Sequence, residues 1–207
     1  MADIQGKIIV RLRGLRLQLL GMASNICMAF ILAAKKVKKG KNLKFWSTTC
    51  IVRYPSSVIR IGNHCSFRSD SNSNLIGINR KCILSTHSAA AVITIGDHCG
   101  FSGTVIGCKE NITFGNNVIC GANSLITDFD WHGIDPARRR NYSGDSKPVK
   151  IGNNVFIGYG AVILKGVEIG ENSVIGANSV VTKNIPANVI AGGNPCKVIK
   201  SLDPVPA

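Results

Sequence analysis

Acidic residues are scarce in this chain of 207 residues. Only 11 Asp and Glu stand against 25 Lys and Arg, which gives a formal net charge of +14 at pH 7. The surplus is concentrated in residues 1–44, where ten basic residues and a single acid, Asp3, supply +9 of the total. Because the remaining residues carry only +5, the sequence does not predict a nucleic-acid-binding protein.

Aromatic residues and closely spaced cysteines are also rare. Aromatics make up 6% of the chain against 22 glycines, a composition that suits a thin β-structure filled by small and aliphatic side chains. The eight cysteines include no CxxC or other close pair, so their spacing indicates free thiols in a reducing, intracellular setting. No signal peptide with a small-residue cleavage site is evident, and we expect a cytoplasmic protein.

The strongest positive pattern is a strict six-residue period. A period of six fits neither the 3.6 of a helix nor the 2 of a strand, and it is typical of a solenoid. Hexapeptide repeats predict an all-β solenoid, a three-sided parallel β-helix in which the first residue of each block and the residue four places later point inward. Gly and Asn then occupy corners that require a positive φ or close backbone contact. The residues that open the six clearest blocks are Ile151, Ile157, Ile163, Ile169, Ile175 and Val181.

The same phase recurs upstream with interruptions, from about Val58 to about Gly193. The sequence predicts three regions: a basic, partly apolar helical segment at 1–44, a β-helix at 45–193, and a tail at 194–207. The β-helix is interrupted near 74–91 and near 128–150. Solenoids accept insertions where loops leave a corner, and long loops concentrate function, so the second interruption is the first place to look for chemistry.

Residues 1–44 lack the hexad, and three interpretations stay open for them. Leu17 to Ala34 is a run of eighteen residues without charge, flanked by arginines before it and by KKVKKGK after it. The segment suits a helical cap over the open end of the solenoid. After the cap, the next interpretation is a basic amphipathic helix on the cytoplasmic face of the inner membrane, and the last is a short transmembrane anchor.

The repeats, the loop after Ile126 and the ending AGGNPCKVI together resemble the hexapeptide-repeat acyltransferases. Within them the likeness is greatest to the maltose, galactoside and nodulation-type sugar O-acetyltransferases and to the capsular polysaccharide acetyltransferases. It covers about residues 58–200 and includes His132-Gly133-Ile134-Asp135-Pro136 and Arg138. Gly133 stands where Pro is common, a departure that leaves His132 intact. The resemblance implies a left-handed coil, acetyl-CoA as donor, a homotrimer with sites between subunits, and a carbohydrate acceptor.

Acetyl transfer from a thioester to a sugar hydroxyl requires a base and a donor for the oxyanion. An imidazole suits the first task, and we expect His132 to be the general base in a direct attack. Asp130 could orient the ring, although a solvated loop carboxylate is an equal interpretation. For the oxyanion, the resemblance implies the backbone N–H of Tyr159, with Ser102 near the acceptor hydroxyl; a plain turn serine is the alternative.

The resemblance also implies a coenzyme A groove and an acceptor wall. Small residues would allow the pantetheine arm to approach the backbone, and lysines would meet the phosphates. The residues implied for the cofactor are Phe156, Gly158, Gly176, Ala177, Lys183, Lys197 and Lys200. Those that could face the acceptor are Trp131, Asn79, Arg80 and His87, and Trp131 could instead pack against the coil beneath it.

Three rival functions remain. An N-acetyltransferase of an amino sugar or nucleotide sugar uses the same scaffold, and so does a non-catalytic assembly of hexapeptide repeats. A zinc hydratase resembling the γ-class carbonic anhydrases would need converging histidines, and the spacing of the four histidines offers no close pair. We therefore expect no metal.

Overall fold

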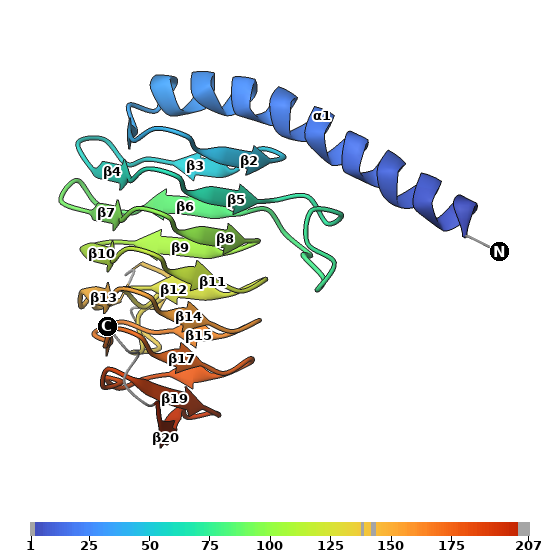
Figure 1. The fold of residues 1–207 in the computed structure, drawn as a ribbon. Helices are drawn as coiled ribbons and strands as arrows, with labels where there is room; N and C mark the ends of the chain where they lie inside the picture. Colours follow the sequence, from blue (N-terminus) through green and yellow to red (C-terminus); the bar gives the residue numbers. More distant parts are fainter. Residues whose placement is uncertain (1–2, 138, 142–143, 203–207) are drawn as a thin grey trace.

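The computed structural model describes residues 3–137, 139–141 and 144–202. Within them a long helix is followed by a stack of short strands (Figure 1). The elements are α1 (Ile4–Ala34), β1 (Lys38–Lys39), β2 (Lys44–Trp46), β3 (Cys50–Val52), β4 (Val58–Ile61), β5 (Ser66–Arg68), β6 (Ile83–Thr86), β7 (Val92–Ile95), β8 (Gly100–Ser102), β9 (Val105–Cys108), β10 (Asn111–Phe114), β11 (Ile119–Cys120), β12 (Leu125–Thr127), β13 (Val149–Ile151), β14 (Phe156–Ile157), β15 (Val162–Ile163), β16 (Glu168–Ile169), β17 (Val174–Ile175), β18 (Val180–Val181), β19 (Val189–Gly192) and β20 (Lys197–Ser201).

The strands form three sheets, which are the three sides of a coil. Sheet A has the order β1-β4-β7-β10-β13-β16, sheet B the order β2-β5-β8-β11-β14-β17-β19-β20, and sheet C the order β18-β15-β12-β9-β6-β3. From β1 to β18 each coil adds one strand to A, one to B and one to C, so the neighbours in a sheet come from successive coils. β19 and β20 extend sheet B alone. All pairs are parallel apart from β19 with β20. The predicted three-sided parallel β-helix is confirmed.

The hexad residues fill the interior as predicted. Ile151 and the five residues that open the following blocks are at most 1% exposed, and Val155, Ala161, Val167, Ser173, Ser179 and Ile185 are also buried. Cys65, Cys99 and Cys120 lie among them as buried free thiols. Near the N-terminal end the interior holds stacked rings, with Phe67 centred 5.1 Å from both Phe45 and Phe101. Stacked positions therefore share one apolar column.

The corner between sheets A and B explains the recurring polar residues. In every coil one residue there has a positive φ, and it is Asn or His: Asn42, His64, His98, Asn117, Asn154, Asn172 and Asn188. Asn tolerates this conformation better than most side chains. One step earlier, side-chain oxygens accept N–H groups from the preceding coil, as in Asn116 N–H to Asn153 Oδ1 at 2.8 Å. These bonds tie each coil to the next.

The boundaries differ in detail from the sequence-based ones. The β-helix begins with β1 at Lys38, inside the segment assigned to the helix, because Phe45 and Ile51 pair in register with Phe67 and Leu84. The first interruption occupies 69–82, and β6 lies within the predicted 74–91 loop. The second occupies 128–148. The tail assigned to 194–207 contains β20, which turns back antiparallel along β19.

The C-terminal third of α1 covers the open end of the stack. Asn25 Oδ1 accepts the Phe45 N–H at 2.8 Å, Ser24 Oγ accepts the Ser47 N–H at 2.9 Å, and Met28 Sδ lies 3.3 Å from the Thr49 nitrogen. Met28 and Leu32 are buried beneath the helix. These contacts satisfy first-coil N–H groups that have no preceding coil to pair with. The structure thus supports a capping role for this part of the segment.

Glycine in the second hexad position allows the coils to stack closely, and its substitution tests the spacing. A Cβ on Gly152 would lie 2.6 Å from the Glu171 nitrogen of the next coil. Because backbone cannot yield as a side chain can, we expect Gly152→Ala to lower the free energy of unfolding by about 1–3 kcal/mol, measured by chemical denaturation.

The matched control is Gly176→Ala, at the same hexad position near the end of the stack. A Cβ there meets nothing closer than 3.5 Å, so the stability should change by less than about 0.5 kcal/mol. Equal denaturation midpoints for the two variants would contradict the close stacking.

Candidate functional site

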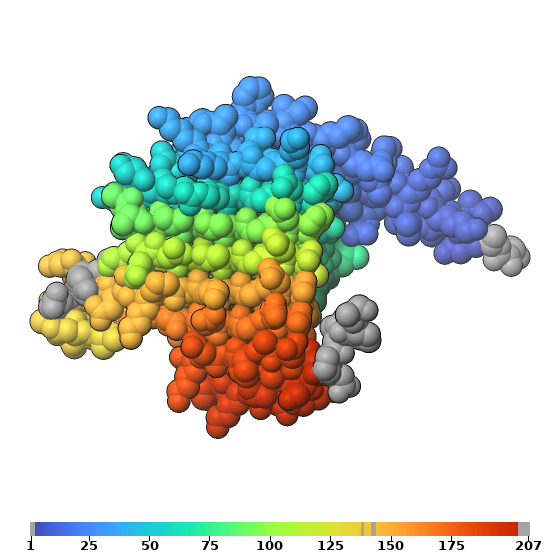
Figure 2. Space-filling model, turned by 60° about the vertical axis from the view of Figure 1, so that its left-hand side comes forward, coloured from blue at the N-terminus to red at the C-terminus, as the bar shows by residue number. Residues whose placement is uncertain are grey.

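The 128–148 loop leaves the corner between sheets C and A through a short two-stranded stem. Phe129 bridges Ser146, Asp130 N–H donates to Asp145 O at 3.0 Å, and Lys147 N–H donates to Asp128 O at 2.8 Å. In Figure 2 this segment, coloured yellow, stands out from the side of the stack. The loop therefore projects from a rigid base.

Asp128 anchors the base of the stem. Its carboxylate is fully buried and accepts the N–H groups of Lys109 at 2.7 Å and Glu110 at 2.8 Å. The Cys108 thiol, whose pKa is raised by burial and by this carboxylate, lies 3.3 Å away and donates to it. Charge-assisted bonds of this kind are among the stronger ones in proteins. Asp128 thus holds backbone and is not available to orient His132.

An aromatic cluster supports the next turn of the loop. Trp131 meets the His87 ring edge-on at 4.9 Å between centroids, and Phe129 lies 4.7 Å from Trp131. Trp131 also lies against Gly107 of β9, where a Cβ would come within 2.6 Å of its ring. The indole therefore packs on the coil beneath while 44% of its surface stays exposed. Burial lowers the pKa of His87, which lies under the loop and not in the first interruption.

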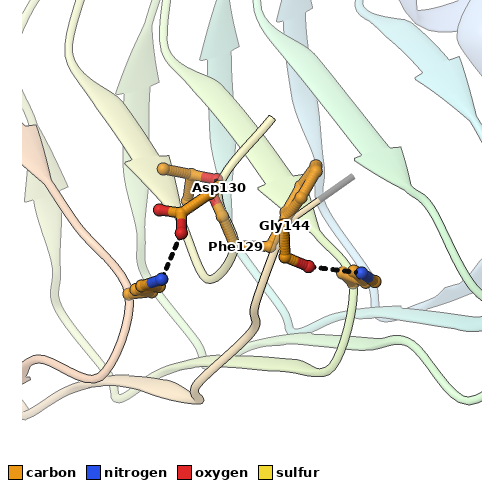
Figure 3. A network of polar contacts seen from close by, with 6 residues as sticks. Phe129, Asp130 and Gly144 are labelled. Atoms are coloured by element: carbon orange, nitrogen blue, oxygen red, sulfur yellow. Dashed lines mark hydrogen bonds and ion pairs between the residues drawn. The ribbon is translucent and has the colours of Figure 1, made fainter. Parts of the chain in front are cut away.

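Asp130 forms an ion pair with Lys165, which comes from the turn after β15. On the other branch of the stem, Gly144 O accepts a hydrogen bond from Lys109 Nζ at 2.8 Å. Figure 3 shows Asp130 and Gly144 side by side on the two branches, with their partners reaching in from opposite sides. Asp130 therefore bonds to a lysine of the next coil, and the structure shows no contact between it and the His132 ring.

His132 is exposed beyond this stem. No hydrogen bond joins its imidazole to any residue of 3–137, 139–141 or 144–202. Its neighbour Gly133 is buried, while Ile134 is 77% exposed. Arg138, the last residue of the motif, lies outside the described residues. The ring thus lies near a fixed stem, and neither of its nitrogens has a hydrogen-bond partner among the described residues.

The remaining catalytic and cofactor candidates lie on sheet B or next to it. Ser102 is on β8, Phe156 is on β14, and Tyr159 is in the turn that leads from sheet B to sheet C. Ser102 is buried and receives a 3.2 Å hydrogen bond from Asn74 Nδ2, in a groove of about 340 Å³ with Arg68 and His98. Phe156 points outward and is 44% exposed. The Tyr159 N–H finds no acceptor within the described part of the chain, whereas the N–H groups of Gly158 and Gly160 on either side are paired.

Asn79 and Arg80 hold the 69–82 loop in place through hydrogen bonds. The Asn79 N–H donates to Asn123 Oδ1 at 3.1 Å, and the Arg80 guanidinium donates to the carbonyls of Gly103 and Asn123. Asn123 Nδ2 in turn donates to Gly77 O at 2.7 Å. These contacts hold the 69–82 loop against the corner between sheets B and C. They place both residues away from His87, with which they were grouped.

The residues implied for a cofactor lie along the last coils. Gly158 lies close against Ala177, where a Cβ would come 2.6 Å from the Ala177 nitrogen. Gly176 and Ala177 follow in the next coil, and Ala177 is exposed. Lys183, Lys197 and Lys200 are exposed too, the last two on β20. Gly158 and Ala177 thus stack on neighbouring coils, and Lys197 and Lys200 lie on the strand that ends sheet B.

Within one protomer these parts do not meet. His132 leaves the corner between sheets C and A, whereas Tyr159 and Ser102 lie at the corner between B and C. A site that combines His132 with Tyr159 and Ser102 would require the B–C corner of another copy of the chain. Among the described residues, no group of three His, Cys, Asp or Glu side chains is arranged to hold a metal ion.

Comparison with known proteins identifies the repeats. Residues 148–183 match the family model described as bacterial transferase hexapeptide (six repeats). The galactoside O-acetyltransferase of Escherichia coli is 47% identical over 92 residues, which are 44% of this chain and 45% of the relative. Protein CapG of Staphylococcus aureus is 72% identical over 53 residues, covering 26% of this chain and 31% of CapG. Residues 148–183 of this chain are therefore hexapeptide repeats similar to those of the acetyltransferases in this family.

The family's fold extends over most of the structure. A galactoside acetyltransferase solved in complex with coenzyme A is 30% identical and superposes with a TM-score of 0.50, covering 80% of this chain and 65% of that one. The predicted left-handed parallel β-helix is accordingly the fold of this chain. The chain spans about half the length of the curated relatives that it matches.

The structure adds positioning residues that the family motif alone did not reveal. Lys165, Lys109 and Cys108 hold the 128–148 stem, and Asn123 holds the 69–82 loop. A weak signal existed for Lys165, a long polar residue in the otherwise aliphatic and glycine-rich block ILKGVE. For the others no sequence pattern pointed to the partner, because each contact joins segments from different coils.

The contact of Trp131 with Gly107 can be tested without touching His132. We expect Gly107→Ala to lift the indole from the coil, since the new Cβ would overlap it, and to loosen the loop. The measurement is the rate of tryptic cleavage after Arg139 and Arg140, which should rise several-fold.

The control is Gly100→Ala, the same change in a strand of sheet B. A Cβ there comes no closer than 3.5 Å to any atom, so the loop should be cleaved at the native rate. If Gly107→Ala were cleaved no faster than the control, Trp131 would not secure the loop.

Proposed function

We propose that this chain is an acetyl-CoA-dependent O-acetyltransferase whose acceptor is a hydroxyl of a sugar or surface-polysaccharide precursor. The observation that carries the proposal is the exposed His132 imidazole, which has no hydrogen-bond partner among the described residues. It lies on a loop whose stem is fixed by Asp128, Trp131 and Asp130. The likeness to galactoside O-acetyltransferases, one of them solved with coenzyme A, supports the donor and the acceptor class.

The chemistry proposed for His132 is general base catalysis. The neutral ring accepts the proton of the acceptor hydroxyl while the hydroxyl oxygen attacks the thioester carbonyl. When the tetrahedral adduct collapses, the C–S bond breaks, and the imidazolium returns its proton to the departing coenzyme A sulfur. Atoms and charge balance without a covalent enzyme intermediate. A positioned base of this kind typically contributes about 10²- to 10⁴-fold in rate.

The Tyr159 N–H is the proposed donor to the developing oxyanion. It has no acceptor within the described residues, so it can bind a new oxygen without breaking an existing bond. A preorganised donor at such a position is worth roughly 3–4 kcal/mol of transition-state stabilisation. Ser102, whose hydroxyl oxygen accepts a hydrogen bond from Asn74, would contact the acceptor hydroxyl.

Coenzyme A would lie along Gly158, Gly176 and Ala177. Small residues at these positions let an extended pantetheine arm approach the backbone closely. Phe156 offers an exposed ring beside the arm, and Lys183, Lys197 and Lys200 offer positive charge to the phosphates.

The proposed assembly is a homotrimer with each site shared between two protomers. The support is geometric, because His132 and the Tyr159 N–H lie at different corners of one coil. In a ring of three copies, one patch of each protomer meets a different patch of its neighbour. The His132 loop of one copy can then face sheet B of the next.

The base is tested by His132→Ala. Removing the imidazole should lower kcat by about 10²- to 10⁴-fold with little change in the KM for acetyl-CoA, measured as thiol release over a panel of mono- and oligosaccharides. The control is His64→Asn, which puts at an A–B corner the residue that other coils carry there. Native turnover by His132→Ala on every acceptor that the enzyme uses would rule out this base.

The shared site is tested by mixing two inactive variants. Tyr159→Pro removes the proposed oxyanion donor and breaks no hydrogen bond among the described residues, because that N–H has no acceptor there. Co-expressed with His132→Ala, it should form mixed trimers in which some sites combine an intact His132 with an intact Tyr159. Activity should therefore return in the mixture, and mixed trimers as inactive as their parents would contradict a shared site.

A further inference from the structure

The outward face of α1 is a long apolar surface without a partner among the described residues. The helix runs across the end of the coil stack, and its N-terminal part projects well beyond the coils (Figure 1). Its large side chains that remain exposed, at 51–73%, include Ile4, Ile8, Leu12, Leu15, Leu19, Met22, Ile26 and Phe30. We call these eight residues the outer stripe.

The outer stripe lies on one face of the helix. Its members follow one another by three or four residues, which is the spacing of neighbours on a single helix face. The residues that bury α1 on the first coil are Ser24, Met28 and Leu32. Met22, Ile26 and Phe30 each come two residues earlier, which is a rotation of about 200°. The stripe therefore points away from the coils.

Basic residues border the stripe, and acids are nearly absent. Lys7 and Arg11 lie along one side of it and Arg16 along the other, all exposed. The helix is followed by Lys35, Lys36, Lys38, Lys39 and Lys41, also exposed, at the same end of the molecule. Asp3 is the single acid in residues 1–44. An apolar face flanked by cations complements a surface of acyl chains and anionic phosphates.

We propose that the outer stripe docks the protein on an anionic lipid bilayer, with α1 lying in the plane of the interface. The coil stack would then stand on the membrane by its N-terminal end. In a trimer the three helices would lie at the same end, and the three contacts would reinforce one another. The proposal does not depend on the acetyltransferase reaction.

A membrane span fits these contacts less well. By length and composition α1 also qualifies as a candidate span. However, Ser24, Asn25, Met28 and Leu32 hold the first coil, and this leaves residues 4–20, fewer than the ~20 apolar residues that a span requires. That remainder contains four basic residues, and Arg13 Nη2 donates to Asn72 O of the 69–82 loop at 2.8 Å.

Pairing of two copies along the stripe is disfavoured by charge. Residues flanking a helix–helix seam stabilise it when their charges are opposite, and here both flanks are basic. A phosphate-bearing surface has the sign that these flanks require. A lipid surface is therefore the proposed partner of the stripe, and the test also detects self-association.

The test is flotation of the full-length protein with vesicles. We expect binding to an equimolar mixture of phosphatidylglycerol and phosphatidylcholine, weak binding to phosphatidylcholine alone, and a clear loss of binding between about 0.1 M and about 1 M salt, where charges are screened within a few ångströms. Binding to neutral vesicles that is equally strong and insensitive to salt would overturn the interfacial arrangement in favour of a span.

The decisive comparison uses two double variants with the same change of charge. Leu15→Glu with Leu19→Glu places carboxylates on the stripe and should weaken vesicle binding by at least about 100-fold. Ile9→Glu with Val10→Glu places them on exposed positions off the stripe and should weaken binding much less. Circular dichroism and thermal unfolding should be alike for both pairs, because none of the four residues packs on the coils.

Equal binding by the two pairs would overturn the proposal. So would a native protein that fails to float but forms larger assemblies dissolved by the stripe variant alone, because the stripe would then cover a second copy. The basic flanks give an independent readout: Arg11→Gln with Arg16→Gln should weaken binding roughly 30-fold. The control, Arg60→Gln with Lys150→Gln on exposed positions of sheet A, should bind like the native protein.

Discussion

Backbone pairing between successive coils is the constraint on which the other features of this molecule depend. Every strand of the three sheets donates to the coil before it or after it, so an inward residue always lies above an inward residue. Glycine and asparagine at the corners keep that pairing close, through contacts that leave no room for a Cβ and through the side-chain bonds between coils. Any insertion must therefore leave at a corner, and it inherits its direction from the stack.

The 128–148 loop shows how a rigid stack can position an exposed histidine. Three different contacts fix the stem: a buried carboxylate on backbone N–H groups, an indole lying on a glycine, and an ion pair to the next coil. The partners come from coils on both sides of the loop. His132 lies just beyond them, so its position is set by the stack while its side chain stays exposed.

The N-terminal helix has two faces with different surroundings. One face supplies hydrogen-bond acceptors and apolar contacts to a first coil that would otherwise expose unpaired N–H groups. The opposite face carries apolar side chains that none of the described residues covers, between basic residues. The cap and the proposed membrane contact are therefore compatible uses of the same helix, although they were considered as alternatives from the sequence.

The sequence by itself determined the coil and most of its interior. A strict hexad leaves no choice about which residues point inward, and the predicted positions from Ile151 to Ile185 are all buried. It also located the loop that carries His132, because an interruption in a periodic pattern is visible in one dimension. Only the tertiary structure decided that Asp130 bonds to Lys165, that His87 lies under Trp131, and that Arg80 secures its own loop. Each of these contacts joins segments brought together by the stacking of coils, and side-chain pairing across coils has no periodic signature in the chain. The sequence did not predict the first coil, which begins at Lys38, for a related reason. Its register is set by pairing with the next coil, because the hexad pattern is weak there.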